Sequence, residues 1–212
     1  MRLHDYWRSG AAYRVRIALN LKGVPYEQVS HDLRIGEQAA PDYAALNPQK
    51  LVPALEIGGA VLIQSSAIIE WLDEVYPDPP LLPTDPIARV QARGMAQLVV
   101  SDIHPIVNLR VQKMLRTGLS ATDEQVGLWM RHWIADGFEA LEALVGRDGG
   151  RFAFGDTPTL VDCCLVPQLY SAERYGVDLD GFPKLVAAGT AARHLPAFVA
   201  ADPSNQPDGE LA

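Results

Sequence analysis

A serine and a glycine lie where a short strand is predicted to turn into a helix. Residues 2–6 are predicted to form the strand, and apolar residues recur at three- and four-residue spacing after Ala11. Ser9 and Gly10 therefore fall at a helix N-terminus, where main-chain N–H groups lack partners and the helix dipole is positive. Such a turn can stabilise a phosphate, a carboxylate or a thiolate, with the serine hydroxyl as an additional donor. Serine is also a preferred helix cap, so the turn alone leaves a structural role for Ser9 open.

A proline marks a second segment that could contact a ligand. Pro53 stands directly before the predicted strand Ala54–Ile57, where proline fits as a first residue, on an edge or in a cis turn. We expect a cis bond between Val52 and Pro53, which would turn the main chain of Val52 outward, free to pair with an extended ligand. A trans loop is the alternative, because cis bonds are rare among all bonds that precede proline.

The elements that must position these residues occur in the order βαβ, helix, ββ hairpin and helix. A βαβ unit implies parallel strands, and the hairpin with its Gly58-Gly59 turn adds antiparallel ones. The remaining predicted elements of this part are a first helix after Ala11, a strand over residues 26–30, a short helix over 42–46, a strand over 60–63 and a helix that Gln64-Ser65-Ser66 opens.

Everything beyond a proline-rich stretch is predicted to be helical. We expect a domain over residues 1–77, a linker over 78–86 and an all-helical domain over 87–212. Pro105 should kink a single long helix over 87–116, and Thr122 and Thr159 each begin a capping box. The other expected helices cover 122–145, 159–174 and a segment from Pro183, and the residues after Asp202 are expected to form a loose tail.

Composition excludes several classes of function. The 212 residues carry a net charge of -8 without a run of Lys and Arg, which argues against a nucleic-acid partner. No apolar run is long enough to span a bilayer and the N-terminus has no apolar signal core, so we expect a cytoplasmic protein. Cys163 and Cys164 are neighbours in a predicted helix, which disfavours a mutual disulfide or a shared metal. We expect them to be small buried residues, and no metal site is predicted.

The whole pattern resembles the glutathione transferase family. A thioredoxin-like α/β domain (βαβ–α–ββα), a proline linker and an all-α domain are the architecture of that family, and four motifs carry the resemblance. These are the Ser9 turn, Leu-Val-Pro-Ala-Leu at 51–55, Gln64-Ser65, and Gly-Asp-Thr-Pro-Thr-Leu-Val-Asp at 155–162. Arg8-Ser9 followed by Arg14-Val-Arg-Ile-Ala-Leu19 is similar to the zeta class. That class usually has Ser-Ser-Cys where this chain has Ser9-Gly10-Ala11, which puts chemistry that needs the cysteine in doubt.

The resemblance implies a glutathione site. The γ-glutamyl end of glutathione should sit on Gln64 and Ser65, with its carboxylate at a helix N-terminus. Its cysteinyl main chain should pair with Val52 before Pro53, and Lys50 either reaches the glycine carboxylate or stays in solvent. The sulfur would come to Ser9, where a hydroxyl donor and the helix end favour thiolate over thiol.

Zeta-class members include glutathione-dependent isomerases of maleylacetoacetate and maleylpyruvate. The implied reaction is reversible thiolate addition to a cis double bond, rotation about the resulting single bond, and elimination to the trans isomer. Such a substrate is a dianion, which calls for cationic donors. The candidates are Arg8, Arg110, Arg174 and His104, each with a surface position as its alternative.

Other residues of the motifs are more plausibly structural. Arg14 and Arg16 point to different sides of one helix, so we expect at least one to be solvated or ion-paired, and Asp162 fits a helix cap better than a catalytic acid. The rival functions are a glutathione transferase that conjugates electrophiles and a non-enzymatic binding module on the same fold. The sequence does not separate the two isomerase substrates, and a homodimer is expected from the resemblance alone.

Overall fold

The computed structural model of the chain describes residues 1–211, with side chains as far as Gly209. Contacts divide it into two compact units. The first joins Met1–Leu81 with the segment from Arg193 onward, and the second is Leu82–Ala192. We had expected the helical domain to begin at residue 87 and to include the whole C-terminus. The grouping of the C-terminal segment with the first unit therefore differs from the boundaries derived from the sequence.

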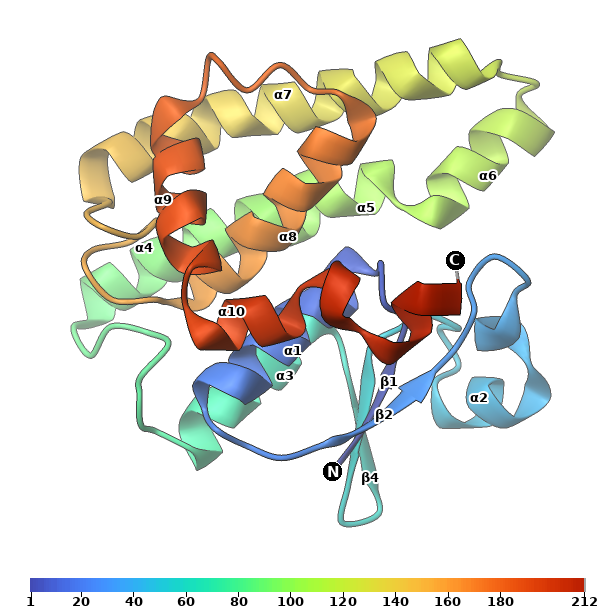
Figure 1. Cartoon of the computed structure of the whole chain (residues 1–212), viewed down its shortest axis with the longest axis horizontal. Helices are drawn as coiled ribbons and strands as arrows, with labels where there is room; N and C mark the ends of the chain where they lie inside the picture. The colour runs from blue at the N-terminus through green and yellow to red at the C-terminus, as the bar shows by residue number, and fades with distance from the viewer. Residues whose placement is uncertain (212) are drawn as a thin grey trace. The chain divides into compact units, whose positions relative to one another are not determined.

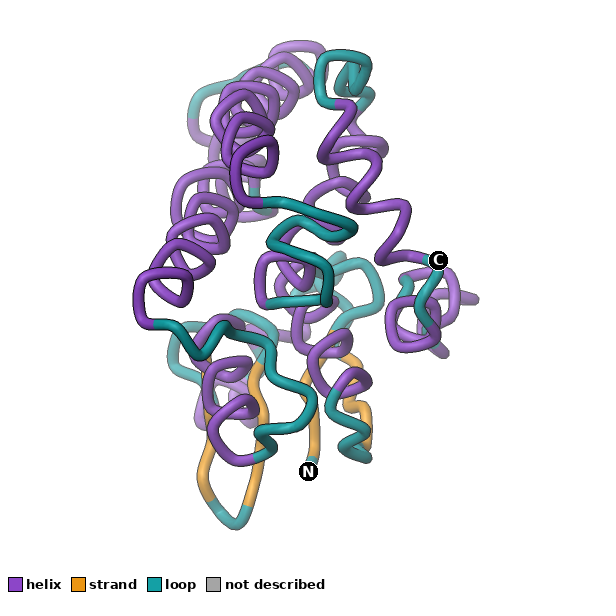
Figure 2. The backbone as a smooth tube through the Cα atoms, turned by 90° about the vertical axis from the view of Figure 1, so that its left-hand side faces the viewer, coloured by secondary structure: helices purple, strands orange, loops and turns teal. Residues whose placement is uncertain are grey.

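A four-stranded mixed sheet is the centre of the first unit (Figure 2, orange). Its order is β2-β1-β3-β4, with β1 parallel to β2 and the other two pairs antiparallel. The thioredoxin-like order predicted from the sequence is confirmed, because the α1 crossover forces β1 and β2 to be parallel while the Gly58-Gly59 turn makes a hairpin. The strands are β1 (Arg2–Asp5), β2 (Glu27–Ser30), β3 (Ala54–Ile57) and β4 (Ala60–Ile63).

Helices pack against this sheet in a way that the alternation of β1 explains. Successive side chains of a strand point to opposite faces. Asp5 pairs with Arg16 of α1 (Gly10–Leu21), whereas the neighbouring His4 contacts the ring of Tyr43 in α2 (Pro41–Leu46). Helix α3 (Ser65–Val75) packs against α1 and buries Ile68, Ile69 and Leu72, the apolar face that its sequence predicts. A 3-10 turn, η1 (Glu37–Ala39), precedes α2.

The C-terminal segment is ordered against the first unit. Helix α10 (Pro196–Ala201) lies along α1 (Figure 1), and two 3-10 turns follow it, η3 (Pro203–Asn205) and η4 (Pro207–Leu211). The prediction of a loose tail after Asp202 is wrong. Gln206 is buried, and its side-chain amide nitrogen Nε2 donates to the carbonyl oxygens of Ala200 and Asp202 at 2.9 and 2.7 Å.

The second unit is built of helices, and its first long segment is interrupted. Helix α4 (Pro86–Gln97) continues into a π-helical stretch, η2 (Leu98–Ile103), and then α5 (His104–Val107). The helical run is interrupted at Asn108, whose main chain is extended and whose side chain caps α6 (Leu109–Gly118). The prediction of one long helix kinked at Pro105 is therefore wrong, because the interruption lies at Asn108. Proline has no N–H to donate, and here it stands in the first turn of α5, where none is needed.

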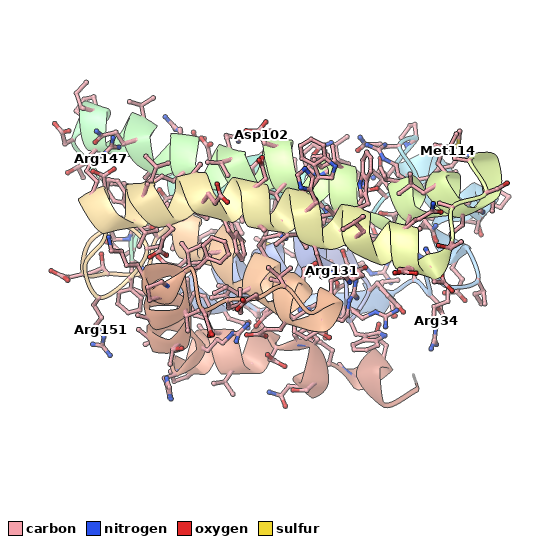
Figure 3. All side chains as sticks on the ribbon, turned by 90° about the horizontal axis from the view of Figure 1, so that it is seen from above. Arg34, Asp102, Met114, Arg131, Arg147 and Arg151 are labelled. Carbon is pink, nitrogen blue, oxygen red and sulfur yellow. The ribbon has the colours of Figure 1, made fainter. Side chains whose placement is uncertain are left out.

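The remaining helices of this unit are α7 (Asp123–Asp148), α8 (Leu160–Tyr175) and α9 (Pro183–Arg193). Helix α7 contacts α5, α6 and η2, and α8 contacts α4. Figure 3 labels Asp102, Met114, Arg131 and Arg147 on η2, α6 and α7, and all four side chains are exposed. Cys163 and Cys164 are buried in α8, as expected.

Both predicted capping boxes are present. Thr122 caps α7 and Thr159 caps α8, each with the reciprocal contact from the third helical residue. The carboxylate of Asp162 accepts from the main-chain N–H groups of Ala153 and Thr159, both at 2.8 Å. Burial nevertheless raises the pKa of Asp162 to about 6. The interpretation of Asp162 as a cap is confirmed.

A polar cluster beside α2 joins β1, β3 and the residue that follows β2. His4 Nδ1 and His31 Nε2 are 2.8 Å apart, and His4 Nε2 is 2.7 Å from a carboxylate oxygen of Glu56. The ring of His31 lies 4.3 Å from that of Tyr43. A hydrogen bond between two imidazole nitrogens requires one of them to be unprotonated, so both rings cannot be cationic in this arrangement.

Acidification should therefore destabilise the protein through this cluster. Burial, followed by the charge of His4, lowers the pKa of His31 below its usual value. The unfolded state then binds the proton more tightly, and the free energy of unfolding should fall as the pH drops from 7.5 through about 6.5, the ordinary histidine pKa. Urea denaturation at several pH values would measure this fall. His31→Gln should flatten the pH dependence whereas His132→Gln, at an exposed site, should leave it unchanged; equal slopes for both would contradict the assignment.

Candidate functional site

Strand register brings the three predicted glutathione-binding segments to one edge of the sheet. His4 pairs with Ala54, and Ala54 pairs with Ile63. The turn after β1, the residues before β3 and the residues after β4 consequently leave the sheet at the same end. Ser9, Val52 and Ser65 belong to these three segments in that order. A ligand lying across this edge could contact all three.

Ser9 caps α1 and keeps a donor available. Its Oγ accepts from the N–H of Ala12 at 3.3 Å, and its own N–H donates to the carbonyl oxygen of Tyr6 at 2.9 Å. Because the cap uses the oxygen as an acceptor, the hydroxyl hydrogen can still donate. The capping role and a ligand-binding role of Ser9 are thus compatible, and the side chain is half-buried at the positive end of α1.

A buried arginine fixes the turn before Ser9. The side chain of Arg16 is 0% exposed and pairs with the carboxylate of Asp5, whose two oxygens both lie 2.8 Å from Nη1. Its other nitrogens donate to the carbonyl oxygens of Trp7 at 2.9 Å and Ala201 at 3.0 Å. Arg16 is therefore the structural, ion-paired residue of the Arg14/Arg16 pair, as expected.

The loop before β3 presents an unpaired main chain. The Val52-Pro53 peptide bond is cis, as predicted. The carbonyl oxygen of Leu51 accepts from the Tyr43 hydroxyl at 2.6 Å and the Asn47 amide at 2.8 Å. Within the described residues the N–H and C=O of Val52 form no hydrogen bond, although Val52 is only 8% exposed. A buried main chain without partners calls for an external one.

The start of α3 carries a second group of hydrogen-bond donors that could bind an anion. Ser65 is the first helical residue and is buried, and its Oγ accepts from Nη1 of Arg14 at 3.3 Å. Gln64 before it has φ of 70°, a left-handed value that is uncommon outside glycine, and its side-chain amide bonds Gln49 at 2.9 Å. The helix N-terminus and the guanidinium of Arg14 together favour a carboxylate at this position.

The remaining predicted residues of the first unit are Lys50 and Arg8. Lys50 is exposed, with φ of 56°, in the turn that Asn47 holds through Gln49. The guanidinium of Arg8 lies 5.1 Å from the centre of the Trp7 ring, which fixes its stem while leaving its N–H groups available. Pro53 is buried beside Val52.

The three candidates of the helical unit occupy different positions. Arg174, near the end of α8, stacks on the Tyr175 ring and donates to its hydroxyl, which also accepts from Gln112 of α6 at 2.9 Å. His104 begins α5 and is half-buried. Arg110 is exposed in the first turn of α6, two positions from the buried Gln112. Two helical positions differ by about 200°, so Arg110 faces away from the Gln112–Tyr175 contact.

Sequence reasoning missed several residues that shape the site. The contact of Arg14 with Ser65 and the support of Leu51 by Tyr43 and Asn47 are examples. The Asn47-Pro48 pair is a turn signal that could have identified the support of Leu51. No local signal identifies the contact of Arg14 with Ser65, because these residues are 51 positions apart.

Comparison with known proteins identifies the family of the chain. Family models described as the N-terminal and C-terminal domains of glutathione S-transferase match residues 3–80 and 128–188. A maleylacetoacetate isomerase from Pseudomonas aeruginosa is 49% identical over 215 residues, which cover 100% of both chains. The chain belongs to the glutathione S-transferase family.

Solved structures of that family place the chain in its zeta class. A holo structure of a maleyl pyruvate isomerase, described as a bacterial glutathione S-transferase in the zeta class, is 51% identical with a TM-score of 0.96, covering 98% of this chain and 99% of that one. A maleylacetoacetate isomerase from Methylobacterium extorquens AM1, with bound malonate and glutathione, is 38% identical with a TM-score of 0.95 and 98% coverage of both chains.

The resemblance drawn from the four sequence motifs is thus confirmed, and the glutathione S-transferase fold accounts for both units. Among the described residues, no helix is long and apolar enough to cross a membrane. The same residues contain no group of three or more His, Cys, Asp or Glu arranged to hold a metal ion.

Arg16→Met should destabilise this glutathione S-transferase strongly. The substitution leaves the Asp5 carboxylate buried without its partner and should lower the free energy of unfolding by about 3–5 kcal/mol. Urea denaturation would measure the loss, with Asp5→Asn as a milder variant if Arg16→Met does not fold. Arg131→Met, at an exposed position of α7, is the matched control and should change stability by about 0.5 kcal/mol or less. Equal stability of the two Met variants would refute the anchoring role of Arg16.

Proposed function

We propose that this glutathione S-transferase is a glutathione-dependent cis–trans isomerase that converts maleylacetoacetate or maleylpyruvate to the fumaryl isomer. The observation that carries the proposal is the strand register that gathers Ser9, Val52 and Ser65 at one edge of the sheet. The three full-length relatives named above carry the names of isomerases of these two substrates. The enzyme class therefore follows from the family, and the residues of the site supply its chemistry.

The residues present fit glutathione. A tripeptide needs partners for an extended main chain, and the unpaired N–H and C=O of Val52 offer both. Its γ-glutamyl carboxylate needs cationic and N–H donors, which the N-terminus of α3, Ser65 and Arg14 provide. Gln64 would bind the same end, and Lys50 would reach the glycine carboxylate.

Ser9 would set the charge state of the sulfur. When bound, glutathione supplies a thiolate that adds reversibly to the cis double bond of the substrate. The hydroxyl of Ser9 would donate a hydrogen bond to the sulfur, and the dipole of α1 is positive at this point, so both would lower the pKa of a thiol placed there. Gly10 and Ala11 bring no second hydroxyl or thiol, so Ser9 is the side-chain donor of the turn.

Cationic side chains would hold the dianionic substrate. Arg8 directly precedes Ser9, and stacking on Trp7 fixes its stem while its N–H groups can reach a carboxylate. The relative that was solved with glutathione also contains malonate, a small dicarboxylate. We extend this role to His104, Arg110 and Arg174. The side chain of Arg174 is held by its contact with the hydroxyl of Tyr175.

The first experiment distinguishes isomerisation from conjugation. Purified protein is given maleylpyruvate, then maleylacetoacetate, with and without glutathione, while absorbance reports the substrate and titration reports free thiol. We expect glutathione-dependent loss of the cis substrate with no consumption of thiol. Ser9→Ala should lower kcat about 100-fold, because it removes one donor from the thiolate.

This assay has one control variant and three results that would contradict the proposal. Ser120→Ala changes an exposed serine between α6 and α7 that is not among the predicted site residues, and it should retain full activity. Falling thiol would mean a transferase that conjugates electrophiles. Absence of both turnover and glutathione binding would leave a binding module on the same fold. Full activity of Ser9→Ala would remove Ser9 from the mechanism.

We further propose that the enzyme acts as a homodimer in the cytoplasm. The acidic chain of 23.1 kDa should then give a light-scattering mass of about twice that value across micromolar concentrations. A monomer mass would contradict the dimer. Recovery of the protein with membranes after cell fractionation would contradict the location.

A further inference from the structure

We propose that the C-terminal segment, residues 202–209, positions the Ser9 turn, with Asp208 and Gln206 as the positioning residues. The inference rests on the proposed function, because it assigns these residues to the placement of the Ser9 hydroxyl. The segment belongs to the same compact unit as the turn and reaches it across nearly the whole length of the sequence.

Asp208 holds the turn from one side. Its Oδ2 accepts from the main-chain N–H of Trp7 at 2.9 Å and from the hydroxyl of Ser30, at the end of β2, at 2.5 Å. The carboxylate therefore ties the turn to the neighbouring parallel strand. The next residue, Gly209, packs close to Trp7 and Pro203: a Cβ at this position would lie 3.0 Å from the Pro203 oxygen and 3.7 Å from the Trp7 ring.

Arg16 holds the same residue from the other side. Its Nη2 donates to the carbonyl oxygen of Trp7 at 2.9 Å, so both polar groups of the Trp7 main chain are bound by side chains. Trp7 lies two residues before Ser9, and the N–H of Ser9 is bound to the carbonyl oxygen of Tyr6. Once Trp7 is fixed, the short turn leaves the Ser9 hydroxyl few alternative positions.

Gln206 connects the C-terminal segment to the ion pair beneath the turn. Its Oε1 accepts from Nε2 of Gln28 at 2.8 Å, and the same amide of Gln28 lies 3.0 Å from the carboxylate of Asp5. Gln206 also donates to the carbonyl oxygens of Ala200 in α10 and Asp202, and it is 4% exposed. The segment is thus fixed at Gln206 and at Asp208, and both points lead to the turn.

A shift of this turn would affect catalysis more than glutathione binding. The polar groups of Val52 and Ser65 belong to other segments, and no hydrogen bond joins them to Trp7. The Trp7 side chain packs against the cluster that contains Val52, but Asp208 binds the main chain of Trp7 and not its ring. Misplacement of a reacting group by about 1 Å can cost up to about 100-fold in rate. Loss of the Asp208 contact should therefore lower kcat and leave the glutathione KM nearly unchanged.

The test compares Asp208→Ala, Asp208→Asn and Gln206→Ala with the wild type in the full-length protein. Asn keeps an acceptor oxygen for the Trp7 N–H whereas Ala does not. We expect about a 10-fold lower kcat for Asp208→Ala and recovery to within about three-fold of the wild type for Asp208→Asn, with KM for glutathione changed less than about two-fold in both. Asp180→Ala, at an exposed site of the helical unit, is the matched control.

Two further readouts do not depend on turnover. Amide exchange of Trp7, followed by NMR, should be at least about 10-fold faster in Asp208→Ala, since its acceptor is gone. The ultraviolet absorbance of the thiolate of bound glutathione should be weaker in Asp208→Ala at the same occupancy. Gln206→Ala should show the same changes to a smaller extent, because it acts through Gln28 and Asp5.

The outcomes separate the two proposals. Unchanged Trp7 exchange and thiolate absorbance in Asp208→Ala would overturn the positioning role. Equal losses of kcat, glutathione affinity and stability, without recovery in Asp208→Asn, would also overturn it in favour of general destabilisation. A wild type that binds glutathione as thiolate but turns over neither substrate would refute the proposed isomerase, and the two readouts would still decide the role of Asp208.

Discussion

The buried pair of Arg16 and Asp5 is the interaction on which the first unit depends. Replacing a buried ion pair by apolar side chains is often neutral for stability. Here the guanidinium also satisfies carbonyl oxygens of Trp7 and Ala201, which an apolar replacement would leave buried without donors. A single side chain thus joins the first strand, the first helix, the turn before Ser9 and the C-terminal helix. Arginine suits this role because its planar fork carries five donors in fixed directions.

Most of the fold could be predicted because its signals are local. The Gly58-Gly59 hairpin, the apolar face of α3 and the capping boxes at Thr122 and Thr159 each depend on residues a few positions apart. The three segments that we propose to bind glutathione could be recognised for the same reason, as short motifs within single turns. Their meeting at one sheet edge follows from the order of strands, which the βαβ and hairpin units restrict to few arrangements.

The errors arose where distant contacts override local composition. The residues after Asp202 are polar and rich in Pro, Ser and Asn, which is typical of a loose tail, yet bonds to Gln28, Ser30 and Trp7 order them. The break at Asn108 is an exception, because its cause is local. The periodicity of residues 87–116 suits a continuous helix, but the extended main chain of Asn108 ends α5 and its side chain caps α6 through Val111, a signal that the apolar pattern alone passes over.

The position of the C-terminal segment affects the order in which the two units fold during synthesis on the ribosome. Domains usually fold as units during synthesis, the N-terminal one first, at about 5–20 residues per second. The first unit of this chain lacks α10 and the partners of Arg16 and Trp7 that lie beyond residue 200 until more than 200 residues have been synthesised. The helical unit, Leu82–Ala192, has no such requirement. The helical unit should therefore be the first to reach its final form, and the α/β unit, although it begins the chain, should complete its structure only after the helical unit has been synthesised.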